Sequence, residues 1–166
     1  MIKNRSFIIM AANLVPVNGI VQNISQFSDN CCEQQVTILG SDGVTNFIVS
    51  PDTYVIGEAR LRPGMPVTAF YDSQLAVPLI FPPRYQAVII GRRNPRENMF
   101  AGYFDENLVS ENNELQLNID NSTTVVTSNG QTFSCRPENQ MLIVYYTDTT
   151  RSIPPQTTPR KVIVMC

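Results

Sequence analysis

The chain has 166 residues, of which 43% are hydrophobic and only 16% are charged, and its formal net charge is −2. A chain of this length and composition can bury a core in one compact domain or two small ones, so we expect a folded rather than a disordered chain. No run of Lys and Arg could neutralise phosphates, and the densest basic stretch, residues 91–96, falls where a linker is expected. We therefore expect no nucleic-acid partner.

The N-terminal arm, residues 1–17, comes first in the chain. Lys3 and Arg5 precede an apolar run that imitates a signal peptide but is too short for one. No stretch of the chain approaches the roughly 18 apolar residues of a membrane span. Because the arm has no place among the strands that follow, we expect it to pair with an open sheet edge of another subunit. Its assembly residues are Phe7, Ile8, Ile9 and Met10.

The first predicted β module covers residues 18–91. Helical periodicity is nearly absent and turn signals recur about every 8 to 15 residues, which is typical of an all-β chain. Asp42-Gly43 between two alternating stretches predicts a tight hairpin, and Pro63-Gly64 predicts a second turn. The predicted strands are residues 19–24, 35–39, 45–49, 53–56, 65–71 and 85–90.

The second predicted β module covers residues 99–166, after a linker at residues 92–98. Asn112-Asn113 and Asn129-Gly130 mark its turns. The first module is longer than the second after its first strand, and the surplus contains two adjacent cysteines. The predicted strands of the second module are residues 100–106, 114–119, 123–127, 141–146 and 161–165.

Matched blocks in the two modules indicate an internal duplication. FIVSPDTYVI at residues 47–56 aligns without a gap on LNIDNSTTVV at residues 117–126. Two further blocks follow in the same order, at separations of about 70 to 75 residues. They are residues 67–72 with 142–146, and Phe81-Pro82-Pro83 with Ile153-Pro154-Pro155. The alternative is that any all-β chain rich in Val, Thr and Pro matches itself loosely.

The strand pattern predicts an architecture for each module. About five short strands, with a Pro-Gly turn before the last but one and a long connection before the last, are typical of a small, partly closed Greek-key barrel of the OB type. We therefore expect two tandem OB-like barrels with an N-terminal arm. A split sandwich made from both modules is the competing architecture, and the strand content supports either.

The four cysteines are Cys31, Cys32, Cys135 and Cys166, and the chain has no histidine. A vicinal pair with two isolated cysteines matches no zinc spacing, so we expect no metal. Adjacent cysteines rarely bridge each other without strain, so each needs a partner elsewhere, within the chain or in another chain. The alternative is four reduced thiols. We expect Cys31 or Cys32 to pair with Cys166 of a neighbouring subunit.

Catalytic patterns are missing from the sequence. There is no histidine to activate Ser or Cys, no nucleophile elbow, and the eight glycines are scattered singly, so no phosphate loop is formed. The acidic residues Asp52, Glu58 and Asp72 fall in or beside turns, with nothing tying them to a pocket. We expect neither an enzyme nor a cofactor.

Two other features bear on binding. One is a set of aromatic residues that could form a stacking platform for sugars or bases. The alternative is that one residue of each adjacent pair lies in the core and the other covers the outer face of the sheet. The set comprises Phe70, Tyr71, Tyr145 and Tyr146, with Tyr54 and Tyr85 near them in the sequence.

The other feature is a proline-flanked connection that contains Leu79, Ile80 and Phe81. If these side chains are exposed, they form an apolar interaction loop. If the connection folds back, they plug the end of the barrel.

The blocks FIVSPDTYVI, RPGMPVTAFYDSQLAVPLIFPPRYQAVII and TTRSIPPQTTPRKVIVMC resemble a group of uncharacterised proteins from anaerobic, spore-forming Firmicutes (Clostridia). The resemblance covers residues 17–166 and is most specific in VPLIFPPRYQA. It implies a bacterial protein of a sporulating or anaerobic cell. The group has no established activity and no functional residues to transfer.

These observations favour a non-enzymatic structural subunit that assembles with itself through β-strand and disulfide contacts. The expected place is a filament or coat on the spore or cell surface, and the alternative is the cytoplasm. The competing function is an OB-like binding module for a cell-wall glycan or peptide.

Overall fold

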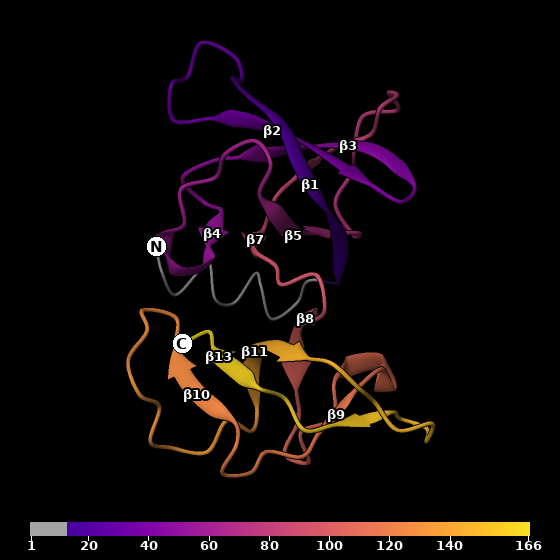
Figure 1. Cartoon of the computed structure of the whole chain (residues 1–166), viewed down its shortest axis with the longest axis vertical. Coiled ribbons are helices and arrows are strands. Elements are labelled where there is room, and N and C mark those ends of the chain that lie inside the picture. Colours follow the sequence, from indigo (N-terminus) through magenta and orange to yellow (C-terminus); the bar gives the residue numbers. More distant parts are fainter. Residues whose placement is uncertain (1–12) are drawn as a thin grey trace. The chain divides into compact units, whose positions relative to one another are not determined.

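The structure is a computed structural model that describes residues 13–166 (Figure 1). These residues divide into two compact units, residues 13–95 and residues 96–166. The described chain is all-β, as predicted, with two short 3-10 turns and no α-helix. None of the sheets is closed into a barrel. Across residues 13–166 there is no helix that could cross a bilayer.

The first unit contains one seven-stranded sheet with the order β4-β7-β5-β1-β2-β3-β6. A 3-10 turn, η1 (Ile56–Glu58), follows the fourth strand. The strands are β1 (Leu14–Gln26), β2 (Gln34–Gly40), β3 (Gly43–Val49), β4 (Tyr54–Val55), β5 (Pro66–Asp72), β6 (Arg84–Gln86) and β7 (Ile89–Arg92).

The long strand β1 connects two parts of this sheet. Its first half, residues 14–20, pairs antiparallel with β5, and its second half, residues 20–26, pairs antiparallel with β2. The register of the second ladder shifts between Val21 and Asn23, an irregularity of the kind that bends a strand. One strand can therefore serve two neighbours that lie on its opposite edges.

The last segment of the unit reaches both ends of the sheet. β6 pairs parallel with β3, whereas β7 pairs antiparallel with β5 and parallel with β4. Between the two strands, the N–H of Ala87 donates to the carbonyl of Ile48 at 3.0 Å, and the N–H of Val88 donates to that of Phe70 at 2.8 Å. The predicted strand at residues 85–90 is thus interrupted where the chain changes partners.

The core of the first unit follows the period-2 alternation of its strands. Val36 and Ile38 of β2 and Val67 and Ala69 of β5 are buried in one cluster with Phe47 of β3. The remaining buried members are Val21, Met65, Ala87 and Ile90. The partly buried Tyr71 and Tyr85 pack against this cluster from the strand ends.

The second unit contains a four-stranded sheet, β10-β13-β11-β8, and a two-stranded parallel pair of β9 and β12. Its core is built from buried side chains of these strands and their connections: Phe104, Leu115, Leu117, Leu142, Val144, Val162 and Val164. The strands are β8 (Asn98–Phe104), β9 (Gln116–Leu117), β10 (Thr124–Thr127), β11 (Gln140–Tyr146), β12 (Gln156–Thr157) and β13 (Lys161–Val164).

A buried carboxylate is paired within the second unit. Glu97 is only 6% exposed, and its two oxygens accept from Nε and Nη2 of Arg160 at 2.7 and 2.8 Å. The hydrogen bond with Glu97 raises the pKa of the Arg160 guanidinium, which also lies over the ring of Tyr145. This bidentate pair fixes the start of β8 to the chain just before β13.

Most predicted strands are present, and two further differences join the break between β6 and β7. The first strand begins at Leu14 rather than residue 19, because residues 14–17 pair with β5. The stretch at residues 114–119 is reduced to two strand residues, because a 3-10 turn, η2 (Glu111–Asn113), with Asn112 and Asn113 at positive φ, occupies the approach to it. The assembly residues Phe7, Ile8, Ile9 and Met10 lie outside the described residues.

Gly19 allows β1 and β2 to approach closely. A Cβ on Gly19 would lie 2.5 Å from the carbonyl oxygen of Leu39, which is backbone and cannot move aside. A Cβ on Gly102, in β8, would lie 3.1 Å from the ring of Phe100, which can turn.

We therefore expect Gly19→Ala to lower the free energy of unfolding by about 1–3 kcal/mol, because the added methyl group forces the strands apart. Gly102→Ala is the matched control and should cost less. Chemical denaturation followed by far-UV circular dichroism measures both. Equal stability of the Gly19→Ala variant and the wild type would contradict the close approach.

Candidate functional site

The connection between β5 and β6 exposes a run of apolar side chains. Leu79 and Phe81 are 102% and 94% exposed, and Ile80 is 47% exposed. The connection is held at both ends: the N–H of Gln74 donates to Oδ1 of Asp72 at 3.0 Å, and the carbonyl of Pro83 accepts from the N–H of Asn46 at 2.9 Å. The loop is therefore anchored on the sheet while these side chains face solvent, so they do not plug the unit.

All four cysteines are exposed, and none is bonded to another. Cys31 and Cys32 lie in the connection between β1 and β2, where the N–H of Cys32 donates to Oδ1 of Asn30 at 2.9 Å. Cys135 lies between β10 and β11, and Cys166 follows β13. No group of three or more Cys, Asp or Glu residues suited to a metal ion occurs in the described part of the chain.

Asp72, one of the acidic residues considered for catalysis, has a structural role. Its side chain is buried, and Oδ1 accepts from the N–H groups of Asn13 and Gln74 at 3.3 and 3.0 Å. These bonds cap the turn that follows β5, which is what a carboxylate at this position of a turn commonly does.

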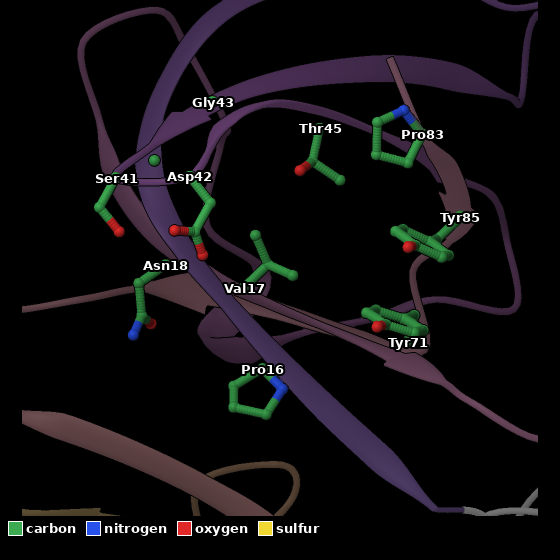
Figure 2. Close-up of a pocket in the computed structure, with 11 residues that line it drawn as sticks. Pro16, Val17, Asn18, Ser41, Asp42, Gly43, Thr45, Tyr71, Pro83 and Tyr85 are labelled. Carbon is green, nitrogen blue, oxygen red and sulfur yellow. The ribbon is translucent and has the colours of Figure 1, made fainter. Parts of the chain in front are cut away.

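A cavity of about 280 Å³ opens in the first unit, between the start of β1, the β2–β3 turn and the ends of β5 and β6 (Figure 2). Its volume lies just below the roughly 300–1,000 Å³ found for small-molecule sites. The lining residues are Pro16, Val17, Asn18, Gly40, Ser41, Asp42, Gly43, Thr45, Tyr71, Pro83 and Tyr85.

Two stacked tyrosines form one wall of this cavity. The ring centroids of Tyr71 and Tyr85 are 3.8 Å apart and the rings are inclined by only 8°. Burial raises the pKa of the Tyr71 hydroxyl, and its hydrogen bond with Tyr85 raises that pKa further. Figure 2 shows the two rings lying parallel to each other beside Pro83. The raised pKa keeps the Tyr71 hydroxyl neutral at neutral pH, so it can both donate and accept a hydrogen bond.

The opposite side of the cavity is polar and comes from the β2–β3 turn and β1. Asp42 is exposed, and Figure 2 shows its carboxylate directed toward Asn18, with the Thr45 hydroxyl on the side of Thr45 that faces Asp42. The orientation of Asn18 is set by Thr68, whose buried hydroxyl donates to the Asn18 side-chain oxygen at 2.6 Å. The amide nitrogen of Asn18 remains the group that can donate to a ligand.

The sequence pointed to only part of this arrangement. It predicts Tyr71 and Tyr85 as aromatic candidates, and Asp42 only as a residue of the hairpin turn. Asn18 had no signal beyond its place before a glycine. In the second unit the guanidinium of Arg160 lies over the ring of Tyr145, and Phe100 and Phe104 form an edge-to-face ring contact with centroids 5.6 Å apart.

No protein-family model, curated protein or solved structure matches the chain.

Proposed function

We propose that this protein is a non-enzymatic structural subunit that assembles with copies of itself in a filament or coat of the spore or cell surface. The observation that carries the proposal is the exposed apolar loop. Of the eight large apolar side chains exposed among residues 13–166, five fall between Leu75 and Phe81. A contiguous apolar patch of this kind is typical of a protein–protein contact.

The composition of the loop suits a contact with another protein. Residues 73–83 contain no charged side chain, so burying them separates no ion from water. Pro78, Pro82 and Pro83 restrict the backbone, so less conformational entropy is lost when the loop is buried. A second copy of the chain is the favoured partner because it presents the same uncharged surface.

The proposal includes a finer description of the fold, in which the two units are tandem copies of one OB-like Greek-key module. Corresponding strand pairs support it. In the parallel ladders Phe47 pairs with Tyr85 and Leu117 with Thr157. The antiparallel ladders match as well, with Ala69 opposite Ile90 and Val144 opposite Val162.

Side-chain hydrogen bonds support the same correspondence. The hydroxyl of Thr53 donates to the carbonyl of Ala87 at 2.7 Å, and that of Thr123 donates to the carbonyl of Pro159 at 2.7 Å. These threonines occupy the same position in the two sequence blocks that align without a gap. Two β sequences that resemble each other only by chance would not be expected to share this hydrogen bond between segments distant in the chain.

Covalent cross-links are the second part of the proposed assembly. When a Cys31 or Cys32 thiol joins the Cys166 thiol of a neighbouring subunit, one S–S bond forms and two S–H bonds are lost. The two electrons and two protons pass to a low-molecular-weight disulfide, which is reduced to two thiols. Such an oxidant is available outside the living cytoplasm, in agreement with a surface location.

The loop can be tested by a double substitution, Leu79→Ser with Phe81→Ser. We expect the wild type to form oligomers and the variant to remain monomeric, with unchanged thermal stability because both side chains are exposed. Light scattering after size-exclusion chromatography and electron microscopy measure assembly. The control is Ile153→Ser, which removes an isolated apolar side chain, 91% exposed, from the second unit. A monodisperse wild-type monomer would refute the proposal, as would normal assembly of the double variant.

The N-terminal arm can be tested by deletion of residues 2–12. This deletion keeps Asn13, whose N–H and side chain bond Asp72 and Ser73. Because Phe7, Ile8, Ile9 and Met10 are proposed to pair with a neighbouring subunit, the truncated protein should fold but not assemble. Circular dichroism and electron microscopy report folding and assembly. Filaments or oligomers equal to those of the wild type would exclude the arm from the contact.

The cross-link can be tested by non-reducing gel electrophoresis of denatured protein. We expect covalent multimers that disappear on reduction, and their loss when Cys31 and Cys32 are both replaced by Ser, because these thiols supply one side of the bridge. Cys135→Ser, which changes a thiol outside the proposed bridge, is the matched control. A single monomer band under oxidising conditions would show that the thiols form no bridge.

A further inference from the structure

We propose that the cavity beside Tyr71 and Tyr85 binds one pyranose ring of a polysaccharide built from uncharged or amino sugars. This site goes beyond assembly, because none of its lining residues belongs to the exposed apolar run at residues 75–81. It would let the subunit attach to a carbohydrate surface while the loop contacts other subunits.

The charge of the lining selects the ligand class. Asp42 is the one charged residue among the lining residues, and no Lys or Arg is among them. Arg84 adjoins Tyr85 in the chain, but its guanidinium lies over the ring of Phe27, 5.1 Å from the centroid. A carboxylate with no neighbouring cation repels phosphate and carboxylate ligands and accepts hydrogen bonds from hydroxyl or ammonium groups.

The polar and apolar groups of the cavity match the two surfaces of a sugar ring. Ser41, Thr45 and the tyrosine hydroxyls can each donate and accept, as the hydroxyl groups of a sugar do. Val17 with the prolines Pro16 and Pro83 supplies apolar contact for the C–H faces. A volume of about 280 Å³ suits a ligand of a single ring rather than a nucleotide or a folded peptide.

The cavity is formed before any ligand enters. The tyrosines hold each other by stacking at 3.8 Å, and Asn18 is held by the buried Thr68 hydroxyl. Gly40 lets the turn approach β1, since a Cβ there would lie 2.6 Å from the carbonyl oxygen of Asn18. Groups that are already fixed lose little conformational entropy on binding, which favours recognition of a weakly bound ligand such as a sugar.

The second unit provides an internal comparison. Thr157 takes the ladder position that Tyr85 occupies in the first unit, so Tyr146, at the position of Tyr71, has no tyrosine to stack on. We therefore place the sugar site in the first unit alone. Tyr146→Phe is accordingly a matched control for Tyr71→Phe.

The test uses three tetrasaccharides, of glucose, N-acetylglucosamine and glucosamine, with inorganic phosphate as the anionic probe. Amide chemical shifts in two-dimensional NMR locate the site, and tyrosine fluorescence gives the affinity, because the chain has no tryptophan to mask it. We expect saturable binding of at least one tetrasaccharide, shifts confined to the cavity residues, and no binding of phosphate.

Three substitutions sharpen the test. Asp42→Asn, at an exposed turn residue, should weaken glucosamine binding by about tenfold or more and the uncharged sugars less, because it removes a charged acceptor. Tyr71→Phe should weaken all binding sugars, whereas Tyr146→Phe should not. The relative losses identify whether an amino sugar or an uncharged sugar is the ligand.

The titrations are made with the wild type and with the Leu79→Ser, Phe81→Ser variant, so sugar binding and self-association are measured independently. Absence of saturable binding for all three tetrasaccharides would overturn the proposal. So would shifts away from the cavity, phosphate binding of equal strength, or unchanged affinity in both Asp42→Asn and Tyr71→Phe. None of these results bears on the proposed assembly.

Discussion

The first unit depends on one short segment, Arg84–Arg92, that hydrogen-bonds with both ends of its sheet. β6 completes the edge beside β3, and β7 supplies the partner of β5 and β4. The N–H of Tyr54 also donates to the carbonyl of Val88 at 2.9 Å, so β4 is attached through the same segment. Without it, strands at two distant places in the sheet would each present unpaired backbone groups.

In the second unit, residues 156–164 likewise pair with strands at two places. β12 pairs with β9, and β13 pairs with β11 and β10. Between these two strands, the side chain of Arg160 donates a hydrogen bond to the buried carboxylate of Glu97. In each unit main-chain hydrogen bonds hold this segment in place, and the side chains beside it differ: a tyrosine pair in the first unit and an ion pair in the second.

Local sequence patterns predicted the β class, the Asp42-Gly43 hairpin and most strands, because alternation and turn chemistry depend on neighbouring residues. The break at Ala87 and Val88 could not be predicted, since it arises where one segment leaves β3 and joins β5. The cavity was missed for the same reason. Long-range pairing brings Asn18 and Tyr85 to the same cavity. The sequence marks Tyr85 only as one of several aromatic candidates, and Asn18 has no local signal for a site.

The positions of the thiols limit the form that a cross-linked material could take. A subunit with one reactive place can only dimerise, and one with two can only extend a line. Here exposed cysteines occupy three separate places in the chain, residues 31–32, 135 and 166. Because adjacent cysteines seldom bridge each other, Cys31 and Cys32 could each bond the Cys166 of a different neighbour in the assembly we propose. With its own Cys166, a subunit in that assembly could form up to three bonds, so a line of cross-linked subunits could branch.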